Sequence, residues 1–182
     1  IIYLEVILKK KIINVSEPKL SNKTKEYVLD CIQTEWISSS GSYLETFENK
    51  WAKYCNKKYA VSVTSGTAAL IVALKSLNLK SGDEVIMPSF TIISCALAVI
   101  EAGGRPVLAD CDLDTWCIQP NEIKNKISNR TKAILIVHMF GHPVNIDEIK
   151  KIIKNKKIVI IEDAAESHGS KFKKEVVGSF GK

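Results

Sequence analysis

The sequence lacks the marks of a membrane or secreted protein. The opening stretch "IIYLEVILKKK" is too short an apolar run to cross a bilayer, and its basic residues follow the apolar ones, the reverse of a signal peptide. The five cysteines are odd in number, form no CxxC pair and lie among apolar or small residues, where a reduced thiol packs as a small hydrophobe. We therefore expect a cytoplasmic protein without a membrane partner. Residues 1–14 are interpreted as an N-terminal extension.

The fingerprints of several ligand-binding classes are also missing. The sequence has neither a Walker A loop nor a GxGxxG motif, which disfavours a nucleotide-binding flavodoxin-like or Rossmann-like protein. Its net charge of +6 comes from lysines interleaved with acids, and no segment joins basic with aromatic residues. We expect no nucleic-acid partner.

Two patterns resemble metal sites but depart from them. His138 and His142 have the spacing of two zinc ligands on a helix, but a glycine and a proline beside His142 prevent a continuous helix there. Three aspartates alternate in Asp110–Asp114 like the start of a calcium loop, without that loop's glycine and final glutamate. We expect no metal, and a loop after a strand that caps the next turn.

What is present is a regular alternation of apolar runs and helical patterns. Short apolar runs predict strands at 59–63, 84–88, 105–110, 132–138 and 157–163, and helices are predicted at 42–56, 64–79, 91–104, 120–127 and 145–155. The helix at 42–56 begins with a capping box and carries Leu44, Phe47, Trp51 and Tyr54 on one face, which predicts a stripe toward a core. The predicted fold class is α/β, with a mainly parallel sheet and helices on both faces.

A first candidate site lies in "VTSGTAAL". It places Gly66 at a strand-to-helix turn between Ser65 and Thr67, so that free amides, hydroxyls and the positive helix terminus converge. This combination favours an anion site, most usefully for a phosphate. The same residues are also explained without a ligand, as a glycine-containing turn with a Ser or Thr that caps the start of a helix.

A second candidate is Asp163, because it ends the apolar run Ile158–Ile161 at the edge where a parallel sheet binds ligands. Burying an unpaired carboxylate is costly, so a cationic or hydrogen-bonding group should meet it. It could also cap the following turn. Together with the Gly66 site it fits a ligand with a phosphate at one end and a protonated ring nitrogen at the other. Pyridoxal 5'-phosphate has both.

These motifs and their order resemble a known family, the pyridoxal-phosphate-dependent DegT/DnrJ/EryC1/StrS sugar aminotransferases of fold type I. The blocks that carry the resemblance are "WISSSGSYLETFE", "AVSVTSGTAAL", "GDEVIMPSFT", "GGRPVLADCDLDTW", "RTKAILIVHMFGHPVNID" and "IEDAAESHGSKFKKEVVGSFG". Residues 15–182 resemble the N-terminal portion of the large, cofactor-binding domain. Within the family, "TEWISS", "HMFGHP" and "EDAAESHG" are most similar to the perosamine synthase subfamily, which acts on GDP-4-keto-6-deoxymannose.

The resemblance implies an activity and its partners. Glutamate would donate an amino group through the cofactor to a nucleotide-linked keto-sugar, in amino-sugar or cell-surface polysaccharide biosynthesis. Active sites of the family are completed across a homodimer, so a homodimer is expected.

The resemblance also assigns roles residue by residue. Gly66 and Thr67 would cradle the phosphate beside Ser65, and Asp163 would pair with the pyridine nitrogen. The family often has Gln or Glu near the ring hydroxyl, where this chain has Glu166. Ile92 stands where an aromatic side chain often stacks on the ring, so it would cover the ring by apolar contact.

The family's Schiff-base lysine is expected beyond residue 182, about ten residues after the "GSFG" block. Lys182 directly follows Gly181, where the family more often has Asp, so it matches the wrong position and no catalytic residue is assigned in this chain. The large domain is then incomplete at its C-terminus, and its last strand would expose an unpaired edge. Two alternatives stay open: a dehydratase of the same family with His at the lysine position, and a catalytically inactive remnant.

Overall fold

The computed structural model of the chain describes residues 13, 14 and 17–181, which divide into two compact units, Ile1–Ser42 and Tyr43–Lys182. The first unit contains helix α2 (Asn22–Gln33). Its N-cap is Ser21, whose hydroxyl oxygen accepts a hydrogen bond from the backbone amide of Thr24. Apart from Ile13 and Asn14, the predicted extension lies outside the described residues. No helix of the described ranges is long and apolar enough to span a bilayer.

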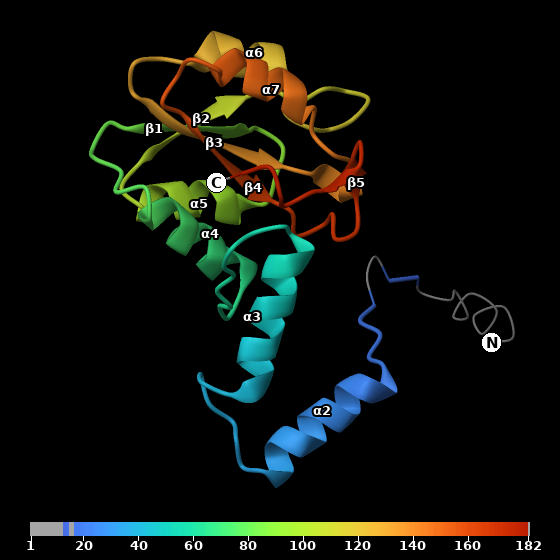
Figure 1. Cartoon of the computed structure of the whole chain (residues 1–182). Helices are drawn as coiled ribbons and strands as arrows, with labels where there is room; N and C mark the ends of the chain where they lie inside the picture. The colour runs from blue at the N-terminus through green and yellow to red at the C-terminus, as the bar shows by residue number, and fades with distance from the viewer. Residues whose placement is uncertain (1–12, 15–16, 182) are drawn as a thin grey trace, which may run out of the picture. The chain divides into compact units, whose positions relative to one another are not determined.

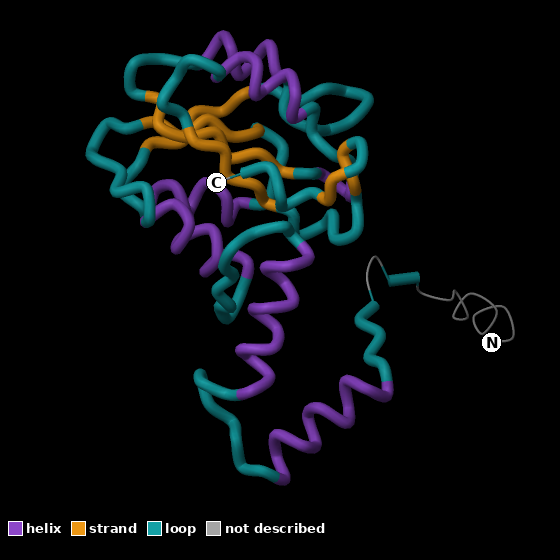
Figure 2. Tube along the Cα trace, viewed as in Figure 1, coloured by secondary structure: helices purple, strands orange, loops and turns teal. Residues whose placement is uncertain are grey.

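The second unit is built on a four-stranded parallel sheet of order β2-β1-β3-β4 (Figures 1 and 2). The strands are β1 (Glu84–Pro88), β2 (Arg105–Ala109), β3 (Thr131–Val137) and β4 (Val159–Asp163). All three pairings are parallel, and β3 and β4 are in register from Ala133 opposite Val159 to Val137 opposite Asp163. The prediction of a parallel α/β sheet is confirmed.

Helices cover both faces of this sheet, as predicted (Figure 1). One face carries α4 (Gly66–Lys75) and α5 (Ile93–Glu101), and the other carries α6 (Pro120–Lys126) and α7 (Ile146–Ile153). Helix α3 (Ser42–Tyr54) precedes them, a one-turn 3-10 helix η1 (Met139–Gly141) follows β3, and a small hairpin pairs β5 (Lys171–Phe172) with β6 (Glu175–Val176). The core consists of the buried residues of the four strands, those of the inner faces of α4, α5, α6 and α7, and a few residues of the connecting loops.

Two expectations are wrong in this structure. Tyr59–Val63 is not a strand, because none of the strands in the described ranges pairs with it, and Tyr59 and Val61 are 74% and 76% exposed. The apolar stripe of α3 is not core either: Phe47 and Tyr54 are exposed, and Trp51 packs against their rings and against that of His168. Both the 59–63 segment and the exposed side of α3 are rich in apolar residues, but the described chain has no other element that packs over them.

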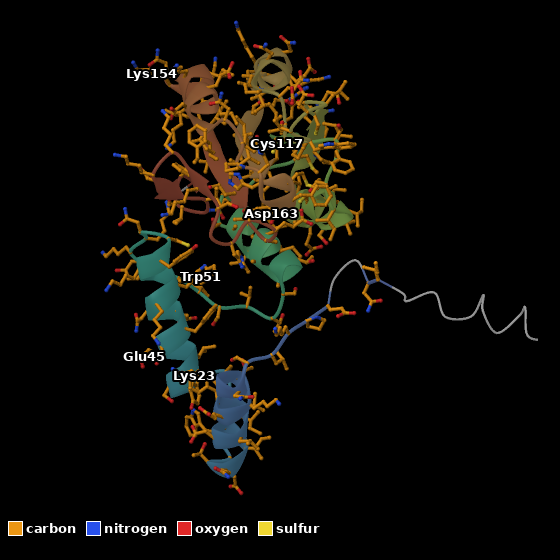
Figure 3. All side chains as sticks on the ribbon, turned by 90° about the vertical axis from the view of Figure 1, so that its right-hand side faces the viewer. Lys23, Glu45, Trp51, Cys117, Lys154 and Asp163 are labelled. Carbon is orange, nitrogen blue, oxygen red and sulfur yellow. The ribbon has the colours of Figure 1, made fainter. Side chains whose placement is uncertain are left out.

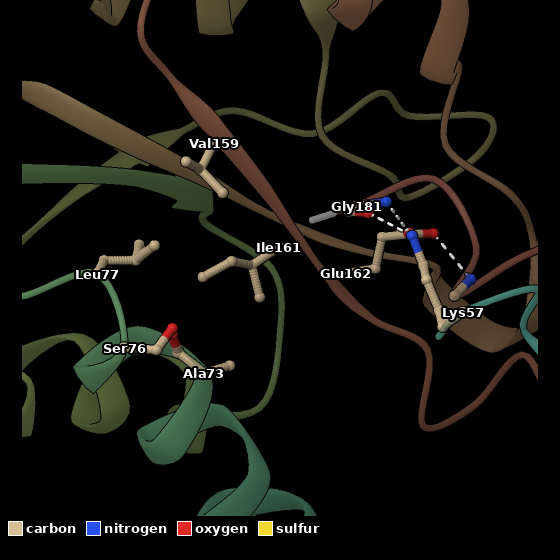
Figure 4. A pocket seen from close by; sticks show the side chains of 9 residues that line it. Lys57, Ala73, Ser76, Leu77, Val159, Ile161, Glu162 and Gly181 are labelled. Atoms are coloured by element: carbon tan, nitrogen blue, oxygen red, sulfur yellow. Dashed lines mark hydrogen bonds between the residues drawn. The ribbon is translucent and has the colours of Figure 1, made fainter. Parts of the chain in front are cut away.

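The β4 edge of the sheet is open. Among the described residues β4 pairs only with β3, which agrees with the expected unpaired edge. A groove of about 360 Å³ runs along it, between the side chains of Val159 and Ile161 on β4 and those of Ala73 and Leu77 in and just after α4 (Figure 4). The groove and the uncovered 59–63 segment both indicate that this part of the sheet is unfinished within the described ranges.

The opposite, amino end of the sheet is fastened by a buried carboxylate. Glu84, at the start of β1, is 2% exposed, and it accepts hydrogen bonds from Ser128, Arg105 and Arg130 at 2.6, 2.5 and 2.8 Å. The Ser128 hydroxyl and the Arg105 guanidinium outweigh the effect of burial and lower the pKa of Glu84 to about 2. This cluster ties β1 to β2 and to the turn before β3.

We predict that Glu84→Gln lowers the free energy of unfolding by about 3 kcal/mol near neutral pH, because it leaves two arginines facing an uncharged amide. The pKa of Glu84 is lower in the folded chain than in the unfolded chain. Its stabilising contribution is therefore complete above about pH 5, declines as the pH falls through the unfolded-state pKa, and is lost as the pH falls toward 2. Urea unfolding from pH 7 to pH 2 measures both effects. A variant as acid-sensitive as the parent over this window would contradict the assignment.

Candidate functional site

The first turn of α4 presents free backbone donors at the carboxyl edge of the sheet. Ser65 is its N-cap, with its hydroxyl oxygen accepting from the amide of Ala68 at 3.2 Å and its carbonyl accepting from that of Ala69. The helix therefore leaves the amides of Gly66 and Thr67 without an intrahelical acceptor. Gly66 is exposed and a Cβ there would meet nothing within 4 Å, so the start of the helix is not covered by the described chain. This is the geometry of an anion-binding helix start.

The first turn of α5 links this site to Asp163. The Thr67 hydroxyl donates to that of Ser94 at 3.0 Å, and the neighbouring Cys95 thiol donates to Oδ2 of Asp163 at 3.5 Å. Burial raises the pKa of Cys95 to about 11, so the sulfur stays a protonated donor. The structure thus brings Thr67 and Asp163, 96 positions apart in sequence, to the same two-residue stretch of α5.

Asp163 itself has two different environments. Its Oδ1 accepts from the backbone amide of Ala165 at 3.1 Å, which is the turn-capping role that the sequence left open. Its Oδ2 faces Cys95, at the end of β4 inside the sheet-and-helix body (Figure 3). The side chain is half-buried and contacts no cation within the described ranges. One carboxylate oxygen is therefore held by the fold, and the other remains able to accept a further donor.

Ile92 and Glu166, the other two candidates, occupy the rim. Ile92 is the N-cap residue of α5 and is 63% exposed, so its side chain is free to cover a ligand. Glu166 is exposed, and its Oε2 accepts from the backbone amide of Phe140 at 3.0 Å. This contact holds Phe140 in a left-handed conformation with φ of 47°. Glu166 thus braces the loop after β3.

Three aromatic rings gather near this edge, where the sequence analysis assigned no function. Phe90 follows β1, Trp116 follows β2 and Phe140 follows β3. The Phe90 ring centroid lies 5.0 Å from that of Trp116 and 6.4 Å from that of Phe140. The rings join three strand-end loops, and all three side chains are exposed.

Glu162, the residue before Asp163, has a structural role that none of the sequence motifs indicated. Its carboxylate is almost fully buried and accepts the backbone amides of Gly178 (2.8 Å), Phe180 (2.7 Å) and Gly181. Its Oε2 also lies 3.1 Å from Nε2 of the fully buried His138. The Nδ1 of that ring accepts the amide of Val144, which leaves the ring hydrogen on Nε2 as a donor to Glu162.

Hydrogen bonds are the main reason that this buried carboxylate stays ionised. Burial by itself would raise the pKa of Glu162, but the hydrogen bonds from His138 and from the amides of Gly181 and Gly178 outweigh it and hold the pKa below its ordinary value. Hydrogen bonds to a charged group contribute about 1.5–3 kcal/mol each, which offsets a desolvation cost of several kcal/mol. Two successive carboxylates at the end of an apolar run were the available signal in the sequence.

The patterns considered for metals have other partners. His138 belongs to the Glu162 cluster, and His142 is exposed. Oδ1 of Asp112 accepts from the amides of Asp114 and Thr115, which confirms the predicted turn-capping role of this loop. Within the described ranges no group of three or more His, Cys, Asp or Glu side chains is placed to hold a metal ion.

Comparison with known proteins gives a family and close structural neighbours. The model of the DegT/DnrJ/EryC1/StrS aminotransferase family matches residues 18–182. The chain is 44% identical over 171 residues to the GDP-perosamine synthase of Escherichia coli O157:H7, covering 94% of this chain and 47% of that protein. It is 39% identical over 169 residues to that of Caulobacter vibrioides, covering 93% and 46%.

Solved structures agree with this result. An aminotransferase from Psychrobacter cryohalolentis matches with a TM-score of 0.87 and 32% identity, covering 91% of this chain and 42% of its own. The E. coli GDP-4-keto-6-deoxy-D-mannose-3-dehydratase with bound hydrated PLP matches with a TM-score of 0.87 and 31% identity, covering 94% and 46%. The chain spans about half the length of the curated relatives it matches.

The burial of the cysteines makes the site geometry testable. At pH 8 we expect N-ethylmaleimide to modify the partly exposed Cys31 and Cys111 first and to leave Cys95 unmodified, because a thiol with a pKa of about 11 is about one-thousandth ionised there. Peptide mass spectrometry at timed intervals measures the order, and labelling in urea is the control for intrinsic reactivity. Modification of Cys95 as fast as Cys31 would contradict the packing of α5 against Asp163.

Proposed function

Because the chain belongs to the DegT/DnrJ/EryC1/StrS aminotransferase family, we propose that it is the N-terminal, cofactor-binding part of a pyridoxal-phosphate-dependent sugar aminotransferase. The observation that carries the proposal is the convergence of the α4 amides and Asp163 on the first turn of α5. It offers donors for a phosphate at one end and an acceptor for a ring nitrogen at the other.

The residues fit pyridoxal phosphate in chemistry and in order. The amides of Gly66 and Thr67 would hold the phosphate, while Ser65 fixes the helix start from which they point. Asp163 would accept from the protonated pyridine nitrogen, Ile92 would cover a ring face, and Glu166 would lie at the rim near the ring hydroxyl. The bound cofactor supplies an electron sink that lets an amino group leave one carbon and join another.

The substrate we propose is a nucleotide-linked keto-sugar of the GDP-perosamine type, with an amino acid, glutamate, as donor. The support is the identity of 34–44% to three GDP-perosamine synthases. One solved neighbour, at 31% identity, is described with bound GDP-perosamine. Such a reaction belongs to amino-sugar or surface polysaccharide biosynthesis.

We place the residue that anchors the cofactor beyond residue 182, in the part of the relatives that this chain does not span. A sugar dehydratase of the same family is the second candidate, because GDP-4-keto-6-deoxymannose-3-dehydratases match with TM-scores of 0.86–0.87. The two would differ at the position of the Schiff-base lysine, which is lysine in the aminotransferase and histidine, which forms no Schiff base, in the dehydratase. If neither residue follows in the complete protein, we expect a catalytically inactive remnant.

We also propose a homodimer in the cytoplasm. Phe140 is 72% exposed next to Phe90 and Trp116, and aromatic residues exposed at the edge of a site are typical of surfaces that another protein copy covers. The five cysteines are all free, which suits a reducing compartment. Sedimentation analysis of the complete protein tests the dimer.

We predict that the chain of residues 1–182 forms no Schiff base with added pyridoxal phosphate at one specific lysine. The complete protein should form one, and it should aminate a nucleotide-linked keto-sugar in the presence of glutamate. Borohydride reduction followed by peptide mapping measures the adduct, and mass spectrometry of the sugar separates amination from loss of water. A specific adduct together with transaminase activity in the 182-residue chain would refute the first expectation.

We further expect Asp163→Asn in the complete protein to lower the turnover about 100-fold or more, because the amide no longer holds the proton on the ring nitrogen. Asp112→Asn is the matched control, since Asp112, like Asp163, caps its own turn at the end of a strand but is not one of the candidate site residues. An equal loss of turnover in the two variants would contradict the assignment of Asp163 to the cofactor site.

A further inference from the structure

Glu162 and Asp163 are adjacent in β4, and their side chains point to opposite faces of the sheet. Successive side chains of a strand point to opposite faces, so Asp163 turns toward α5 and Glu162 turns toward His138 and the loop before α7. The candidate site uses only Asp163. The buried Glu162, with its four hydrogen-bond donors, has no part in that site.

All four donors to Glu162 come from outside its own strand. Three of them are the backbone amides of Gly178, Phe180 and Gly181, which form one tight turn after β6. The fourth, His138, is fixed in turn by the Val144 amide, so the carboxylate rests on a rigid support. A single side chain therefore organises a whole turn, because the turn has its amides directed at one charged point.

The turn is also held from its other side. The Lys57 ammonium donates to the carbonyl oxygen of Gly181 at 2.6 Å, while Glu162 accepts the amide of the same residue (Figure 4). A Cβ at Gly181 would lie 2.9 Å from the carbonyl oxygen of Ile160, so only glycine fits this close to β4. Gly181 is thus held by three contacts: its amide to Glu162, its carbonyl to Lys57, and its Cα close to Ile160. We call Glu162 and Lys57, with these contacts to the turn, the clamp.

We propose that Glu162 is a positioning residue, which fixes the Gly178–Gly181 turn and thereby sets the path by which the following chain carries its anchoring lysine to the cofactor. This inference rests on the proposed function. The clamp holds the last described residues against the end of the strand that carries Asp163, so the start of the following segment is fixed relative to the site. A change in the direction in which the chain leaves this turn would displace a downstream lysine, and a misplacement of about 1 Å can lower a rate about 100-fold.

The substitution Glu162→Gln tests the clamp with little change in shape. A Gln side chain has one acceptor oxygen and one donor nitrogen, so it cannot satisfy donors on both sides. Either Gly178 and His138 or Phe180 and Gly181 then face an NH2 group. His138 cannot adapt, because its Nδ1 already accepts the Val144 amide.

The first measurement is amide hydrogen exchange in the 182-residue chain. We expect exchange at residues 178–181 to become at least tenfold faster in Glu162→Gln, with the amides of β1 and β3 unchanged. Lys57→Met is the second variant, in case the first fails to fold, and it should loosen the same turn less. Glu84→Gln removes the charge of a similarly buried carboxylate at the far end of the sheet, so it controls for lower overall stability and should leave local exchange at the turn unchanged. Unchanged exchange at 178–181 in both test variants would overturn the clamp.

The second measurement uses the complete protein and cofactor trapping. At equal pyridoxal phosphate concentration, we expect borohydride to fix at least tenfold less cofactor on the downstream lysine in Glu162→Gln, and less than a twofold change in Glu84→Gln. Equal trapping in parent and Glu162→Gln would overturn the positioning role alone. If the parent itself traps no cofactor, the proposed function fails and this inference fails with it.

Discussion

Parallel pairing of β3 with β4 is the constraint on which the site depends. It sets Val137 opposite Asp163 and so places the loops after both strands at one edge, next to the first turns of α4 and α5. Side chains alternate along a strand, so a slip of one residue in this register would turn Glu162 toward α5 and Asp163 toward the C-terminal turn. That slip is opposed because it would separate the Glu162 carboxylate from its four hydrogen-bond donors.

The sheet resolves the cost of its buried carboxylates in two ways. At the amino end, Glu84 is paired with two arginines whose own side chains remain largely in solvent. At the carboxyl end, Glu162 is paired with an imidazole N–H and three backbone amides. The first arrangement ties strand to strand. The second arrangement ties a strand to a turn. It orders the backbone more than the first does, because backbone amides cannot move away independently as long side chains can.

The uncovered surfaces have a common explanation. The 59–63 segment, the aromatic stripe of α3 and the groove beside β4 are apolar or carry unpaired backbone, yet the described chain does not cover them. Relatives about twice as long match this chain over nearly its whole length. Under the proposed function, the rest of a longer chain and a second copy would cover these surfaces. These places carry more apolar residues than the described chain buries.

The sequence by itself determined the alternation of strands and helices, the α/β class and the family, because hydrophobic period and motif order are local properties of the chain. It also singled out Gly66 and Asp163, since a glycine at a helix start and an acid at a strand end are visible in a short window. Only the tertiary structure decided that Cys95 meets Asp163, that Phe140 is braced by Glu166, and that Glu162 clamps residues 178–181. Each of these contacts joins segments at least 16 residues apart, and their distance depends on strand register and packing. The failed strand at 59–63 has the same cause: a strand exists only when another strand pairs with it.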